Sequence, residues 1–151
     1  MAGTLAIKVG VLLLWGVWLG IVTLLNVLDA LKEAGQLPAG WRFYSHNYEG
    51  IVQATRIYDT PLWMCRVMYA VVTLWEGAAT VLLLRAALHF SPAAADLAFF
   101  VSLALWGAFM VINEVFLTFL VETGGGYSTA ATHRSLFTSL LVSCVAVALL
   151  P

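Results

Sequence analysis

Four runs of apolar residues constrain this chain more than any other feature of its sequence, because each is long enough to cross a bilayer. A helix needs about 20 mainly apolar residues to span the hydrocarbon core. These runs predict spans over about 7–30, 61–88, 93–121 and 131–150. Only 10% of the 151 residues are charged, whereas about 25% are charged in soluble domains. We therefore expect an integral membrane protein, with the lipid bilayer as its first partner.

The first run superficially resembles a secretory signal peptide, because Lys8 precedes a long apolar stretch. That stretch continues from Val9 to Leu28, and no small-x-small cleavage site follows it. We expect it to be retained as a span. Nothing outside the four spans is long enough for a soluble domain, and no segment repeats. The sequence thus predicts one all-α domain over residues 1–151, an up-and-down four-helix transmembrane bundle.

Capping and turn-forming residues separate the predicted helices. Thr60–Pro61 and Ser91–Pro92 each place a hydroxyl before a proline at the first helical position. The glycines at 124–126 are typical of a helix end, and Ser128 or Thr129 can begin the fourth helix.

The connection between the first and second spans, residues 31–60, is the one sizeable loop, about 30 residues of strongly aromatic character. Its aromatic side chains are Trp41, Phe43, Tyr44, Tyr48 and Tyr58. Such side chains favour the headgroup layer of a bilayer, so we expect a short helix over about 47–58 that lies in the interface. The loop is either a packed cap over the bundle or a surface that binds a partner.

Polar residues form a stripe along the second span. They are Arg66, Tyr69, Thr73, Glu76 and Thr80, spaced 3, 4, 3 and 4 residues apart. At 100° per residue these positions fall within one sector roughly 80° wide. Lipid cannot satisfy such a stripe, so it must face the interior of the bundle or another protein.

Small residues line faces of two other spans. Gly16 and Gly20 form a small-xxx-small motif in the first span, and Ser135, Ser139 and Ser143 repeat every fourth residue in the last. Both patterns allow helix backbones to approach closely. We interpret them as helix-packing faces.

Several polar residues should gather at one end of the bundle, because consecutive helices alternate in direction. They are Asn26, Asp29, Arg66, Asn113, Glu114, His133 and Arg134. We expect a charged layer there, in which Glu114 lies between the guanidinium groups of Arg66 and Arg134 and the amides complete the hydrogen bonds.

Glu76 lies outside this predicted layer, ten residues beyond Arg66 and therefore about 15 Å further along the helix. Its certain neighbours, Thr73 and Thr80, carry only hydroxyls. Three explanations stay open. Glu76 is protonated, or it reaches an arginine through water, or it meets a group from a ligand or another chain.

Short motifs along the whole chain carry a family resemblance. They are "NVLD" (Asn26, Asp29), "YDT", "CRVMYAVVTLWEGAA" (Arg66, Glu76), "NEVF" (Glu114, Phe116) and "THRSLF" (Arg134, Phe137). In these motifs the chain resembles a bacterial family of predicted small integral membrane proteins with four spans and unknown function. The resemblance implies a four-span fold in the bacterial inner (cytoplasmic) membrane and no particular activity. The connection "LHFSPAAAD" departs from the family, which tends to be more basic there.

The signatures of several function classes are missing from the sequence. A net charge of −1 gives no basic surface for nucleic acid. His46, His89 and His133 do not form the Glu-x-x-His pairs of a di-metal bundle, and Cys65 and Cys144 match no CxxC spacing. No Ser-His-Asp order, P-loop or GxGxxG motif is present. We therefore expect no enzyme acting alone and no metal site, and the sequence identifies no particular cofactor.

Two functional hypotheses from different classes remain. In the first, the chain is a non-catalytic accessory subunit of a larger bacterial membrane complex, with electron-transport complexes as one candidate class, or it associates with itself. In the second, its polar interior binds a small molecule such as a quinone or a lipid, or a proton or ion. The site would then consist of Glu76 with Arg66, Glu114 and Arg134.

Overall fold

A computed structural model describes residues 2–112 and 130–151 of the chain. Its four long helices are α1 (Ala2–Glu33), α3 (Leu62–Leu88), α4 (Pro92–Ile112) and α6 (Ala130–Leu149). The described residues contain helices and loops but no strand. All four long helices have the length and apolar composition needed to cross a membrane. The predictions of an all-α fold and of four long apolar helices are confirmed, and they indicate an integral membrane protein.

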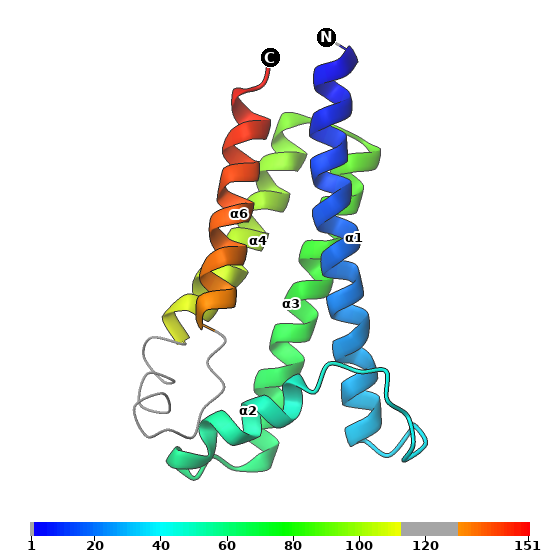
Figure 1. The fold of residues 1–151 in the computed structure, drawn as a ribbon, viewed down its shortest axis with the longest axis vertical. Helices are drawn as coiled ribbons and strands as arrows, with labels where there is room; N and C mark the ends of the chain where they lie inside the picture. Colours follow the sequence, from blue (N-terminus) through cyan, green and yellow to red (C-terminus); the bar gives the residue numbers. More distant parts are fainter. Residues whose placement is uncertain (1, 113–129) are drawn as a thin grey trace.

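The long helices lie alongside one another in chain order (Figure 1). α1 leads away from the N-terminus, α3 returns beside it, α4 packs against α3, and α6 packs against α4. The two chain termini therefore lie at the same end of the molecule. α1 and α6 make a smaller contact with each other. This arrangement makes α1 and α3 the most closely associated pair, and these two helices carry the buried polar residues Asn26, Asp29 and Glu76.

Helix ends explain where the chain turns. α1 ends in a Schellman motif: Gly35 adopts a left-handed φ of 70°, and Gln36 N donates to Leu31 O at 2.9 Å. The predicted cap of α4 is confirmed, because Ala94 N donates to Ser91 Oγ at 3.2 Å. The predicted cap of α3 is wrong, since that helix starts at Leu62 and has no side-chain hydrogen bond at its N-cap.

The connection between α1 and α3 contains a short helix, α2 (Asn47–Thr55), followed by a 3₁₀ turn, η1 (Arg56–Tyr58). The short helix predicted over about 47–58 is therefore present. α2 lies across the end of the molecule opposite the two termini (Figure 1). Its Tyr48 is buried against Cys65 and Tyr69 of α3, which fixes α2 to the start of that helix.

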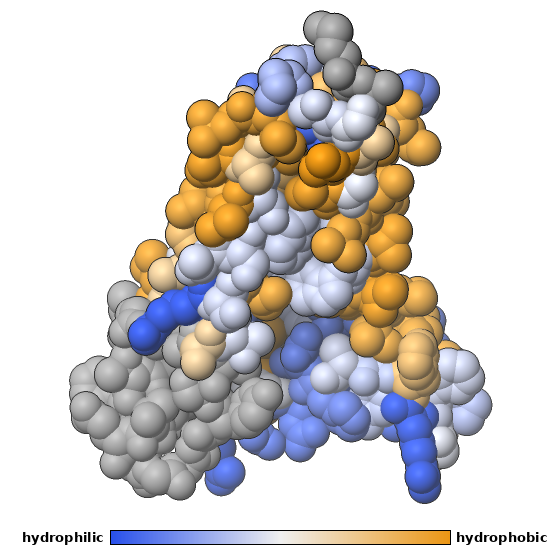
Figure 2. Space-filling view, turned by 45° about the horizontal axis from the view of Figure 1, so that its top comes forward, coloured by the Kyte–Doolittle hydropathy of each residue, from blue (hydrophilic) through white to orange (hydrophobic). Residues whose placement is uncertain are grey.

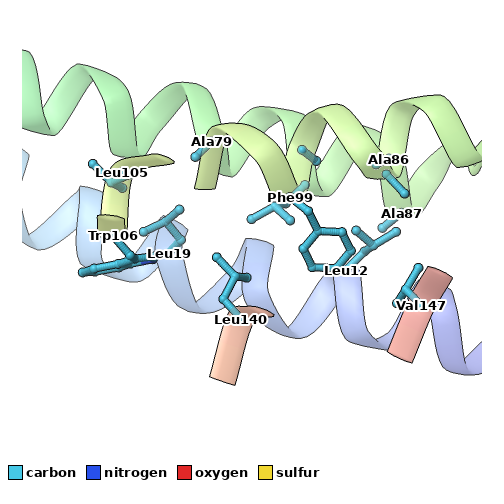
Figure 3. Close-up of a cluster of buried hydrophobic side chains, with 13 residues drawn as sticks. Leu12, Leu19, Ala79, Ala86, Ala87, Phe99, Leu105, Trp106, Leu140 and Val147 are labelled. Carbon is cyan, nitrogen blue, oxygen red and sulfur yellow. The ribbon is translucent and has the colours of Figure 1, made fainter. Parts of the chain in front are cut away.

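The apolar core lies between the four long helices and combines small and large side chains. α3 and α4 contribute alanines, including Ala79 and Ala98, each with no exposed surface. Figure 3 shows Phe99 of α4 in one cluster with Leu12 of α1 and Leu140 of α6. Small residues on α3 and α4 let the helices approach closely, and the larger side chains fill the space that remains.

Hydrophobic residues cover much of the outer surface of the long helices. Leu74 of α3 is 73% exposed and Phe100 of α4 is 69% exposed. Figure 2 shows broad hydrophobic bands along the helices, while hydrophilic residues gather at the end that carries α2. Soluble monomers rarely expose contiguous apolar surface on this scale. The surface pattern thus fits helices that meet hydrocarbon.

Candidate functional site

Glu76 of α3 has a hydrogen-bond partner on α1. The side chain is 3% exposed, and Asn26 Nδ2 donates to its Oε2 at 2.6 Å. Asn26 is itself only 1% exposed. The sequence identified only the hydroxyls of Thr73 and Thr80 as certain neighbours of Glu76 and left its partner open; in the structure an amide of the adjacent helix reaches its carboxyl group.

A donor from α2 holds the side chain of Asn26 in the orientation that this bond requires, and the Tyr69 hydroxyl lies close by. Asn47 Nδ2 of α2 donates to Asn26 Oδ1 at 2.9 Å, and Tyr69 OH lies 3.3 Å from the same oxygen. An asparagine side chain has one acceptor oxygen and one donor nitrogen. With Oδ1 directed at the Asn47 amide, Nδ2 points to Glu76.

Asp29, one turn beyond Asn26 on α1, forms the second half of the polar network. Its Oδ2 accepts from Ser45 Oγ at 3.0 Å, from Tyr48 N at 3.0 Å and from Tyr69 OH at 2.9 Å. Asp29 is 2% exposed. Through these three donors Asp29 ties α1, α2 and α3 together.

We call Asn26, Asp29, Ser45, Asn47, Tyr69 and Glu76 the polar network. Four of these residues were expected in the polar interior from their sequence pattern: Asn26, Asp29, Tyr69 and Glu76. Ser45 and Asn47 were not expected, because they belong to a loop and the first turn of α2 and follow no helical period. Their only sequence signal is a short polar stretch, "SHN", inside an aromatic connection.

Both threonines of the predicted stripe are half-buried; Thr73 bonds within its own helix, and Thr80 contacts Thr23 of α1. Thr73 Oγ1 donates to Tyr69 O at 2.9 Å, and Thr23 Oγ1 donates to Leu19 O at 2.9 Å. Thr80 Oγ1 lies 3.4 Å from Thr23 Oγ1 across the α1–α3 contact. Such back-bonding satisfies the hydroxyl within its own helix, so these groups add little to the surroundings of Glu76.

Arg66 does not join the buried stripe, which corrects the expectation for this residue. Its side chain is exposed, whereas the preceding Cys65 is 1% exposed and packs against Tyr48 and Tyr69. The predicted charged layer pairs Arg66 with Glu114, which lies with Asn113 outside the described residues. Asn26 and Asp29, which were expected in that layer, instead belong to the polar network.

His133 and Arg134 lie in the first two turns of α6. The His133 ring stacks on Phe109 of α4 with 4.7 Å between ring centroids and lies 5.7 Å from the Trp106 ring. The Arg134 side chain is exposed. In the described part of the chain, His133 therefore packs in an aromatic cluster on α4.

The small residues of α1 lie at the contact with α3. A Cβ atom on Gly16 would meet Leu84 Cδ2 at 2.8 Å and Leu84 N at 3.2 Å, and one on Gly20 would meet Thr80 Cγ2 at 3.2 Å. Both glycines thus allow α1 to approach α3.

The serines of α6 lie on a face that only partly contacts the chain. Trp15 Nε1 of α1 donates to Ser143 Oγ at 3.0 Å. Ser139 and Ser135, one and two turns earlier, are exposed. Of the predicted helix-packing face, Ser143 therefore bonds to α1, and Ser135 and Ser139 are left exposed.

No group of three or more His, Cys, Asp or Glu side chains suited to a metal ion occurs among the described residues. Comparison with known protein families, with curated proteins and with solved structures finds no match to this chain. The resemblance to a bacterial four-span family stays a prediction from the sequence. Functional inference therefore depends on the polar network and on the exposed helix faces.

Proposed function

We propose that the chain is a non-catalytic accessory subunit of a larger bacterial membrane complex. The up-and-down transmembrane bundle, the location in the bacterial inner membrane and the interfacial position of the α2 region belong to this proposal. Electron-transport complexes are one candidate class. One observation carries the proposal: the serine face of α6 is used at Ser143 and exposed at Ser139 and Ser135.

The serine face of α6, formed by Ser135, Ser139 and Ser143, is suited to contact with a helix of another subunit. Ser143 already contacts α1 through Trp15, and the exposed serines continue the same line along α6. Thr132 and Thr138 are exposed on the same half of the helix. Helix contacts in membranes are enriched in small residues and in hydroxyls that bond across the contact. We infer that a transmembrane helix of another subunit packs here and extends the contact between α1 and α6.

The polar network supports a structural use of the buried residues. Every fully buried side-chain nitrogen and oxygen of the described residues has a hydrogen-bond partner. Recognition of a quinone head or a lipid headgroup would need polar side chains directed at a ligand. The donors around Asp29 and Asn26 are instead used to join α1, α2 and α3. This favours the accessory role over small-molecule binding.

Gentle detergent extraction of the tagged native protein, followed by mass spectrometry and an absorbance spectrum, tests the proposal. We expect stoichiometric recovery of larger membrane subunits. Ser139→Leu and Ser135→Leu should lower that recovery several-fold, because a large side chain blocks helix approach. Ala78→Leu is the matched control, since Ala78 is exposed on α3 and the change is again from a small side chain to leucine.

Other outcomes would contradict the accessory role in distinguishable ways. Recovery of copies of this chain alone would mean that the serine face mediates self-association. Recovery of the chain with a bound lipid, quinone or chromophore and no partner protein would support small-molecule binding instead. Equal recovery of partners with Ser139→Leu and Ala78→Leu would place the contact on another face.

A further inference from the structure

The two carboxyl oxygens of Glu76 have different surroundings. Oε2 accepts the hydrogen bond from Asn26, while no donor among the described residues reaches Oε1. Among the described residues, every fully buried side-chain oxygen has a hydrogen-bond partner. An oxygen that has no partner is therefore not fully buried. Oε1 therefore keeps a small accessible surface although Glu76 as a whole is only 3% exposed.

The surroundings of Glu76 provide little to balance a negative charge. The donors to Glu76 and Asp29 within the described residues are a side-chain amide, two hydroxyls and one backbone N–H, and none of them carries a positive charge. From α1 Glu76 meets the neutral amide of Asn26, and α2 adds the neutral amide of Asn47 behind it. Within α3 the nearest titratable group of the network is Tyr69, which is bonded to Asp29.

α4 adds no nearby charge to this site. Within Pro92–Ile112 its one charged residue is Asp96, in the second turn of the helix. Its buried polar residue is Ser102, whose hydroxyl donates to Ala98 O at 2.8 Å. A buried carboxylate that has one donor and no cation is costly. The charge is removed if the carboxyl group takes up a proton.

We propose that Glu76 is a reversible proton-binding site of the membrane domain, with Asn26 as its positioning residue. Oε1 takes a proton from water and becomes the hydroxyl of a neutral carboxylic acid, while Oε2 continues to accept from Asn26 Nδ2. Release of the proton to water restores the carboxylate. This site is separate from the serine face of α6. The proposal of a proton-binding site can therefore be correct or wrong whether or not the chain is an accessory subunit.

Proton uptake at Glu76 is linked to α2 through a shared residue. Asn26 donates to Glu76 and accepts from Asn47 at the start of α2. A change in the charge of Glu76 alters the strength of the first bond, since hydrogen bonds to ionised groups are roughly twice as strong as neutral ones. The orientation of Asn26, and with it the anchoring of α2, then responds to the proton.

Infrared difference spectroscopy of the full chain in lipid nanodiscs tests this proposal. Spectra recorded between acidic and alkaline buffers should contain a protonated-carboxyl C=O band that changes with pH. The band should shift when glutamate is labelled with ¹³C and should be absent in Glu76→Gln. In Asn26→Leu it should move in frequency, because the acid loses the hydrogen bond at Oε2. A purely structural Asn26 would change stability without moving this band.

Glu49→Gln is the matched control, since Glu49 is an exposed glutamate of α2 and its loss should leave the band unchanged. If Glu76→Gln does not accumulate, Glu76→Asp keeps the carboxyl group, and the band should then lose its sensitivity to glutamate labelling. A labelled band that does not change with pH would overturn the proposal, because the acid would be permanently protonated. Persistence of the band in Glu76→Gln, or no labelled band at any pH, would also overturn it.

Discussion

Asn26 on α1 donates to Glu76 on α3 over 2.6 Å, and this contact joins the C-terminal part of α1 to the middle of α3. The same Asn26 side chain accepts from Asn47 of α2. One amide therefore connects three elements of the fold. Such a group acts as a register device, because a shift of α1 by one turn would separate it from both partners.

Replacement of Asn26 by leucine should lower the free energy of unfolding by about 1–3 kcal/mol, because the change leaves the buried carboxyl group of Glu76 without its donor. Glu76 loses its donor and Asn47 loses its acceptor. The measurement is unfolding by sodium dodecyl sulfate in mixed micelles. Thr23→Val is the control on the same helix, where a 3.4 Å contact with Thr80 is lost, and its effect should be clearly smaller. Equal effects of the two changes would contradict the role assigned to Asn26.

Tyr69→Phe removes one hydroxyl that contacts both Asp29 and the backbone of α1. Tyr69 OH lies 2.9 Å from Asp29 Oδ2 and 3.0 Å from Asn26 O. We expect a loss of about 0.5–1.5 kcal/mol of unfolding free energy, the usual net value of a hydrogen bond. Tyr44→Phe, which keeps the ring that packs on Lys32, should change stability less.

A double-mutant cycle with Asp29→Asn separates the contact of Tyr69 with Asp29 from other effects. Residues in one hydrogen-bond network are non-additive, with coupling energies of about 0.5–3 kcal/mol. We expect the double variant to be less destabilised than the sum of the single variants. Additive effects would show that Tyr69 and Asp29 act independently.

Because Arg66 is exposed, its loss should have little effect on stability, whereas a buried charged layer would make the same loss costly. Arg66→Gln should change the unfolding free energy by no more than about 0.5 kcal/mol, as is usual for exposed positions. Cys65→Leu, at the adjacent buried position, should cost about 1–3 kcal/mol through overpacking. The same detergent unfolding measurement compares both. A larger loss for Arg66→Gln would restore the ion-pair hypothesis.

The lengths of the apolar runs predicted the helices well, because hydrocarbon thickness imposes a minimum length on each span. α3 begins one residue after its expected start, and α6 spans 130–149 against an expected 131–150. α1 extends at both ends, from Ala2 to Glu33 rather than from 7 to 30. Its end depends on the glycine turn at Gly35, and hydropathy carries no information about such a turn.

Helical periodicity predicted which face of α3 carries polar groups, but it could not identify their partners. Tyr69 and Glu76 are buried as their spacing indicates. Arg66 lies at the edge of the predicted sector, roughly 100° from the centre of the buried face when each residue turns the helix by 100°. The partner of Glu76 depends on the relative rotation and shift of α1 and α3. Close contacts such as Gly16 with Leu84 set that geometry, and no local pattern encodes it.

The close approach of α1 to α3 gives a last expectation. Gly16→Ala should destabilise the protein by about 1–3 kcal/mol, because the added Cβ would lie 2.8 Å from Leu84 Cδ2 and 3.2 Å from the backbone nitrogen of Leu84. The side chain of Leu84 can rotate away, but its backbone cannot move without shifting α3. Gly10→Ala is the matched control on the same helix, where nothing lies within 4 Å of the new atom. It should be neutral or stabilising by up to about 1 kcal/mol, since alanine favours helix. If both changes stabilise the protein in detergent unfolding, α1 does not approach α3 as closely as this structure shows. If only Gly16→Ala destabilises it, the contact that aligns Asn26 with Glu76 is supported independently of either polar residue.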